Sequence, residues 1–127
     1  MKSNNTVLEK SEDFSVRIIN LYRYLAFDKK EFVLSKQLLR SGTSIGANAT
    51  EAQNASSDKD FIAKMEISLK EQGETAYWLR LLKRTDYLTQ TQFEAINNDC
   101  EELGKLLTSI IKSKKSKKQL SIVNCQL

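Results

Sequence analysis

Apolar residues recur at alternating steps of three and four in four separate stretches of this chain. Such spacing places the residues of a stretch on one face of an α-helix. The chain has no proline and only four glycines among 127 residues, which disfavours a fold rich in turns and strands. The pattern therefore predicts an all-α fold, an antiparallel up-and-down four-helix bundle. The stripes are Val7, Phe14, Ile18, Leu21 and Leu25, with a gap at Ser11; Leu34, Leu38, Ser41, Ile45, Asn48 and Ala52; Ile62, Met65, Leu69, Gln72, Ala76 and Leu79; and Phe93, Ile96, Cys100, Leu103, Leu107 and Ile110.

Polar residues at the starts of the stripes indicate where the helices begin. A hydroxyl or carboxylate side chain can accept a hydrogen bond from a free amide, and an acid three residues later can reach back. The matching pairs are Thr6 with Glu9, Asp28 with Glu31, and Thr91 with Glu94, and Ser57 or Asp58 can cap the third helix. The predicted helices span residues 6–26, 29–54, 58–85 and 90–113. They form one domain, residues 1–113, followed by a lysine-rich tail at 114–127.

The composition narrows the chemistry that the chain can perform. The absence of histidine removes the commonest metal ligand and the commonest general base, so we expect no catalytic residue, no metal and no other cofactor. Two cysteines, Cys100 and Cys125, are too few for a disulfide framework and fit a reducing compartment. No secretory signal is visible, and no apolar run approaches the roughly 18 residues of a membrane span. We therefore expect a cytoplasmic protein with no membrane partner.

Small residues are concentrated in the second predicted helix, in the run SGTSIGANATEAQ. Gly42 and Gly46 are four residues apart and share a face. Each glycine inside a helix costs about 1 kcal/mol relative to alanine, so two together predict a close helix–helix contact. A phosphate-binding loop is the alternative, but it needs a preceding strand and a Gly-Lys-Ser/Thr ending, and neither is present.

Polar residues also follow one side of the second and third predicted helices. They are Arg40, Ser44, Asn48 and Glu51, and then Glu71, Glu74 and Trp78. Carboxylates beside large apolar residues need a counter-charge, which Arg40, Arg80 or a neighbouring subunit could supply. We interpret these residues as a structural polar network or an oligomer interface. A di-iron site is the competing interpretation, and it would require Glu-x-x-His motifs that the chain lacks.

The basic residues at the end of the chain stand apart from the rest. Residues 112–118 carry five lysines and no acid, whereas residues 1–111 have a net charge of −1. Such a run is either a solvated tail or a nucleic-acid contact. We predict no exposed pair of aromatic side chains that could read bases, so the expected RNA binding tolerates any sequence. The candidate binding residues are Lys112, Lys114, Lys115, Lys117 and Lys118.

Two runs together resemble the 23S rRNA intervening-sequence protein family: QLLRSGTSIGANATEA at 37–52 and MEISLKEQGETAYWLRLL at 65–82. The resemblance covers about residues 14–112 and carries no catalytic residues. It implies an antiparallel four-helix bundle, often assembled as a homopentameric ring. It also extends to the accessory proteins of diversity-generating retroelements, which are basic pentamers that bind nucleic acid and a reverse transcriptase. The matching positions are Gln37, Leu38, Arg40, Ser41, Ser44, Ile45, Asn48 and Glu51, then Ser68, Glu71, Glu74, Trp78 and Leu79.

These observations lead to two alternative functions. The first is a non-enzymatic nucleic-acid-binding protein, an RNA or RNP accessory factor that forms a homo-oligomeric ring. The second is a structural or protein-interaction scaffold that binds no nucleic acid. The expected partners are further copies of the chain, with a pentamer favoured by the resemblance, and either RNA or a protein partner.

Overall fold

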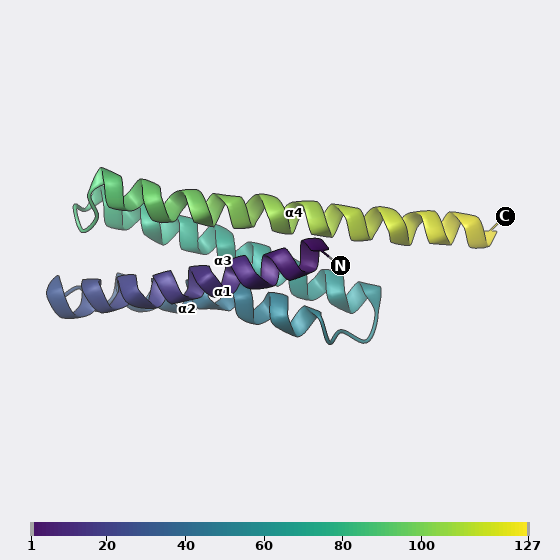
Figure 1. The fold of residues 1–127 in the computed structure, drawn as a ribbon, viewed down its shortest axis with the longest axis horizontal. Coiled ribbons are helices and arrows are strands. Elements are labelled where there is room, and N and C mark those ends of the chain that lie inside the picture. Colours follow the sequence, from purple (N-terminus) through teal and green to yellow (C-terminus); the bar gives the residue numbers. More distant parts are fainter. Residues whose placement is uncertain (1, 127) are drawn as a thin grey trace.

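A computed structural model describes the backbone of residues 2–126 and the side chains of residues 6–120. The described chain forms four α-helices and one short π-helical segment. These are α1 (Lys2–Arg23), η1 (Tyr24–Asp28), α2 (Leu34–Ala52), α3 (Asp58–Arg84) and α4 (Gln90–Gln126). Consecutive helices run in opposite directions, and α1 also packs against α4, so the bundle closes on itself (Figure 1). The predicted all-α four-helix bundle is confirmed. None of the helices in the described range combines the length and apolar content needed to cross a membrane.

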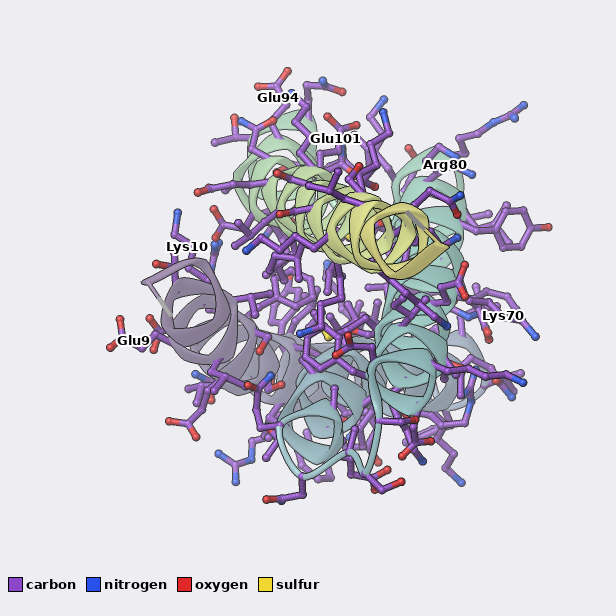
Figure 2. The ribbon with its side chains drawn as sticks, turned by 90° about the vertical axis from the view of Figure 1, so that its right-hand side faces the viewer. Glu9, Lys10, Lys70, Arg80, Glu94 and Glu101 are labelled. Atoms are coloured by element: carbon purple, nitrogen blue, oxygen red, sulfur yellow. The ribbon has the colours of Figure 1, made fainter. Side chains whose placement is uncertain are left out.

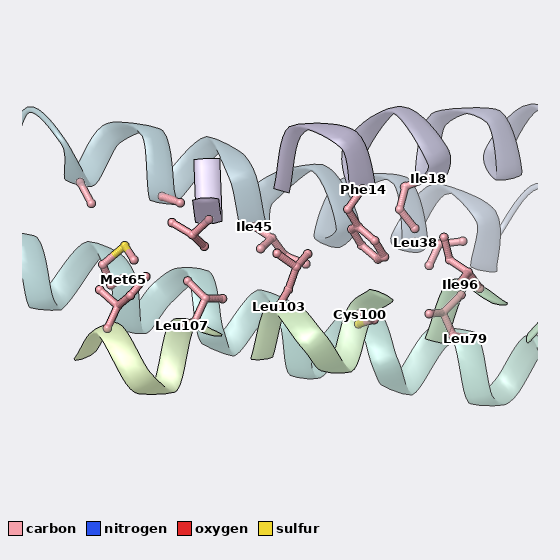
Figure 3. Close-up of a cluster of buried hydrophobic side chains, with 14 of the residues drawn as sticks. Phe14, Ile18, Leu38, Ile45, Met65, Leu79, Ile96, Cys100, Leu103 and Leu107 are labelled. Atoms are coloured by element: carbon pink, nitrogen blue, oxygen red, sulfur yellow. The ribbon is translucent and has the colours of Figure 1, made fainter. Parts of the chain in front are cut away.

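The core consists mainly of the faces that the stripes predicted, and the side chains of Ile18, Leu38, Ile45 and Leu79 are among those that are fully buried. Figure 3 shows these side chains pointing from their helices into one shared interior. Burying a side chain of this size stabilises the fold by about 1.5–3 kcal/mol relative to leaving it exposed. The bundle is therefore held mainly by these stripes.

Small residues bring α1 and α2 into close contact. A Cβ added at Gly46 would lie 3.2 Å from the Ser11 hydroxyl and 3.3 Å from the Ser11 carbonyl oxygen. A Cβ added at Gly42 would lie 2.8 Å from two carbons of Ile18. Ser11 is also the residue at the gap in the first apolar stripe, and it is buried. The small side chains on both helices explain why the two backbones approach so closely.

The starts of α1, α2 and α4 differ from the expected caps. The first helix begins at Lys2, so Thr6 and Glu9 lie inside it and cannot form its capping box. The fourth helix is capped by Thr89, whose hydroxyl accepts from the Gln92 amide at 3.1 Å while the Gln92 side chain accepts from the Thr89 amide at 2.9 Å. That reciprocal pair replaces the predicted pair of Thr91 and Glu94. For α3, Ser57 accepts from the Asp60 amide at 3.1 Å, which confirms Ser57 as the cap.

The start of α2 differs most from the expectation, because the helix begins at Leu34 rather than near residue 29. Asp28 belongs to η1, and Glu31 is the residue that caps α2. Its buried carboxylate accepts hydrogen bonds from the amides of Val33, Leu34 and Ser35 at 3.1, 2.9 and 2.6 Å. Burial alone would raise the pKa of Glu31, but these amide bonds outweigh it and lower the pKa overall.

The predicted tail is part of α4, which continues to Gln126 instead of ending near residue 113. The last turns of α4 extend beyond the ends of the other helices, on the side of the bundle opposite to the α1–α2 and α3–α4 connections (Figure 1). We call residues 112–126 the α4 arm. The lysines of this segment are thus presented on a helix, and Cys125 lies beyond the described side chains.

Candidate interaction surfaces

Arg40 of α2 holds together two carboxylates of α3. One guanidinium nitrogen lies 3.1 Å from Glu71 and another contacts Glu74, while the Trp78 indole N–H donates to the same Glu74 oxygen at 3.2 Å. The hydrogen bond from Arg40 lowers the pKa of Glu74, and the same bond raises the pKa of the guanidinium. The Glu71 side chain is only 14% exposed, whereas that of Arg40 is 49% exposed, so the group lies at the bundle surface.

The rest of the predicted polar network does not join this group. Ser44 donates to the Arg40 carbonyl at 2.6 Å, and the Asn48 amide donates to the Ser44 carbonyl at 2.8 Å. Both bonds lie within α2 and do not reach α3. Glu51 instead pairs with Lys64 of α3 at 3.0 Å. The structure therefore brings four of the seven predicted residues together and separates the other three.

A buried hydroxyl network between α2 and α3 was missed by the sequence analysis. Thr75 lies 2.9 Å from the Ser41 hydroxyl and donates to the Glu71 carbonyl at 2.8 Å, while Ser68 donates to the Ile45 carbonyl at 2.7 Å. Ser41, Ser68 and Thr75 are all fully buried. The spacing of seven between Ser68 and Thr75 places both on one face of α3, and that was the available signal.

Cys100 is packed in the core and has the properties of a filler residue. Burial raises the pKa of its thiol to about 11. The thiol contacts the Gln72 carbonyl at 3.6 Å, and the Gln72 amide donates to the Cys100 carbonyl at 3.0 Å. A thiol that stays protonated at neutral pH is a poor nucleophile. The described side chains also contain no group of three or more Cys, Asp or Glu residues placed to hold a metal ion.

The α4 arm is partly tied to α3. Lys114 pairs with Asp58 at 3.1 Å and lies 5.2 Å above the Phe61 ring, and Lys115 pairs with Glu66 at 3.2 Å. Among the described side chains, Lys112, Lys117 and Lys118 form no ion pair. Lys118 faces a groove of about 550 Å³ between the start of α3 and the arm, together with Lys59. Three of the five lysines are thus free to meet an external anion.

Charged side chains also point outward from other parts of the bundle. Figure 2, viewed from the end at which the arm projects, shows Lys10 of α1 and Lys70 and Arg80 of α3 pointing outward. Lys10 pairs with Glu102 of α4, and Arg80 lies over the Tyr77 ring at 5.8 Å. The α4 arm carries five lysines between residues 112 and 118 and no acid.

The fold and these surfaces define an all-α bundle protein with a basic helical extension. The profile of the 23S rRNA-intervening sequence protein family matches residues 3–109, and the chain belongs to this family. It is also similar to a protein of unknown function from the S23 ribosomal protein family of Bacteroides thetaiotaomicron VPI-5482, whose crystal structure was determined at 1.70 Å resolution. The two chains are 60% identical, with a TM-score of 0.86, over 87% of this chain and 98% of the other. No protein with a curated description matches. The α4 arm lies outside the segment that the family profile covers.

Proposed function

We propose that this protein is a non-enzymatic RNA-binding accessory protein, and that it binds RNA through the α4 arm as a homo-oligomer. The observation that carries the proposal is the set of unpaired lysines on this helix, Lys112, Lys117 and Lys118. The rest of the chain, residues 1–111, has a net charge of −1, so the attraction for phosphates is concentrated in the arm. The family's name, which refers to 23S rRNA, supports RNA as the nucleic acid.

The ion pairs of the α4 arm indicate how strongly the affinity for RNA should depend on salt concentration. Each phosphate neutralised on a single strand contributes about −0.7 to the slope of log affinity against log salt. Three free lysines therefore contribute a slope of about −2 for each chain. Lys114 and Lys115 contribute less, because each must first leave an acid of α3. A homo-oligomer presents several arms at once and gains affinity from the high local concentration.

The test is a titration of unstructured RNA at several salt concentrations with two matched variants. In the first, Lys112, Lys117 and Lys118 are changed to Gln; in the second, Lys114 and Lys115 are changed to Gln. We expect the first variant to lose about two units of salt slope for each arm engaged, and the second to lose clearly less. Equal losses, or binding that persists unchanged in the first variant, would move the RNA site away from the free lysines.

The proposed assembly surface is the outer face of α3 around Arg40. Ile67 and Tyr77 are 43% and 48% exposed on this helix, beside the half-buried Trp78. A second copy of the chain would cover these apolar side chains, and closed symmetry is the usual result for soluble assemblies. The family resemblance favours five subunits.

Sedimentation at micromolar concentration tests the assembly. We expect no dominant 14.5 kDa species for the wild-type chain. Changing Ile67 and Tyr77 to Lys should release the monomer, whereas Val16→Lys, on the exposed face of α1, should not. A wild-type chain that sediments as a monomer would refute the homo-oligomer.

The alternative function is a structural or protein-interaction scaffold without RNA binding. It is supported by the nearly neutral charge of residues 1–111. The two functions differ in one measurement, because a scaffold would assemble normally and show no affinity for RNA even at low salt.

A further inference from the structure

The connection between α1 and α2 exposes large apolar side chains that the proposed function does not use. Phe27, Phe32 and Val33 are 62%, 52% and 72% exposed. The α3–α4 connection lies at the same end of the bundle, yet its Leu88 is only 4% exposed (Figure 1). Of these two connections, the one between α1 and α2 is therefore the one that exposes large apolar side chains. We define the loop-end patch as Phe27, Lys29, Lys30, Phe32 and Val33.

The loop-end patch is held in a fixed conformation. The Lys29 amide donates to the Tyr24 carbonyl at 3.1 Å, and the Glu31 amide donates to the Leu25 carbonyl at 2.8 Å. Lys30 adopts a left-handed conformation with φ of 59°, which needs support from its surroundings. The Glu31 carboxylate supplies that support by binding three amides at the start of α2. Phe27 and Phe32 therefore lie on a connection whose backbone is already fixed by hydrogen bonds. Binding a ligand there would not require the entropic cost of ordering this connection.

The surroundings of the loop-end patch are basic. Arg23, Lys29, Lys30 and Lys36 are all exposed, and none of them forms an ion pair among the described side chains. Asp28 is the one exposed acid in the range 23–36, because the Glu31 carboxylate is buried on backbone amides. An anionic ligand is therefore favoured over a neutral or basic one.

We propose that the loop-end patch binds a single-stranded segment of RNA, with bases stacked on Phe27 and Phe32 and phosphates near the surrounding lysines. This inference rests on the proposed RNA binding and adds a second contact, at the opposite end of the bundle from the α4 arm. Exposed aromatic rings beside cations are the features that bind single strands. The exposed pair also corrects the expectation from the sequence that such rings are lacking.

A protein partner and a membrane fit these observations less well. Each partner in a stable protein interface buries roughly 800 Å², and three apolar side chains interspersed with lysines expose far less apolar surface than that. Lysine is also depleted in the cores of protein interfaces. Insertion into a lipid surface is typical of an amphipathic helix with an apolar face, and Phe32 and Val33 lie in a connection between helices.

The test compares two probes, a short oligoadenylate and an abasic ribose-phosphate chain with the same number of phosphates. Replacing both Phe27 and Phe32 with Leu keeps the apolar area but removes the rings. We expect this double variant to bind the oligoadenylate at least about tenfold more weakly and the abasic chain as before. Replacing both with Trp should restore the affinity. Val16→Ala, at a residue that is 53% exposed on α1, serves as the control and should change neither.

The outcomes separate this inference from the proposed function. If the Leu variant binds both probes as the wild type does, or loses both equally, stacking at the loop-end patch is refuted. In that case the proposed function still stands, without the loop-end patch, provided that the variant with Lys112, Lys117 and Lys118 changed to Gln loses affinity for both probes. If the wild-type chain binds neither probe, both ideas fail. Binding to phosphatidylserine vesicles that requires Phe27 and Phe32, with no difference between the two probes, would also overturn the inference.

Discussion

A methyl group added at Gly42 tests how the two closest helices pack. Its carbon would lie 2.8 Å from both Cγ1 and Cγ2 of Ile18, which is fully buried and has little rotamer freedom. Overpacking of this kind costs about 1–3 kcal/mol. Alanine gains roughly 1 kcal/mol over glycine as a helix former, which offsets part of that cost. We therefore expect Gly42→Ala to lower the free energy of unfolding by about 1 kcal/mol.

Gly73 provides the matched control within the same bundle. It also lies inside a helix, but a Cβ there would meet nothing within 4 Å. Gly73→Ala should therefore show only the helix-forming gain and raise the free energy of unfolding by about 1 kcal/mol. Urea denaturation followed by circular dichroism measures the difference of about 2 kcal/mol between the two variants. Both must be measured at one protein concentration, because assembly shifts apparent stability.

A double-mutant cycle assigns the cost to the contact itself. Ile18→Ala removes both carbons that the new methyl would meet, at the cost of a cavity. In that background Gly42→Ala should become neutral or stabilising, because the methyl fills vacated space. The reasoning is refuted if Gly42→Ala is as stable as Gly73→Ala, or if its cost is unchanged when Ile18 is Ala.

Two further predictions concern neighbouring parts of the bundle. Gly46→Leu should cost more than about 1 kcal/mol in the same urea assay, because its side chain would have to displace the Ser11 backbone; a fully stable variant would contradict the close contact. Glu31→Gln should cost about 1 kcal/mol at neutral pH through the weakened cap of α2. Because the folded-state pKa of Glu31 is lowered, its contribution is present above 4.5 and is lost as the pH falls through the folded-state value. Urea titrations at neutral and acidic pH should show the wild-type and Glu31→Gln curves converging in acid, and a constant difference would contradict this role.

The sequence alone was sufficient for the features that repeat along one helix. Steps of three and four identified the core faces, since the period of an α-helix fixes which side chains share a side. The pair Gly42 and Gly46 likewise indicated a close contact, because glycine inside a helix needs a compensating reason. The carboxylates beside Trp78 required a counter-charge, and Arg40 was among the three sources expected.

The helix boundaries, the ion pairs between helices and the exposure of the connections were decided only by the tertiary structure. Asp28 and Glu31 match a capping box, but η1 takes up Asp28 and moves the start of α2, so Glu31 becomes the cap. The lysine run contains no sign that Lys114 would meet Asp58, because that pairing depends on how far α4 extends past the start of α3. The exposure of Phe27 also depends on the path of the connection, whereas its composition alone suggests burial. Local periodicity determines which face of a helix is apolar, and the packing of the helices against one another determines which charges pair and which rings remain in solvent.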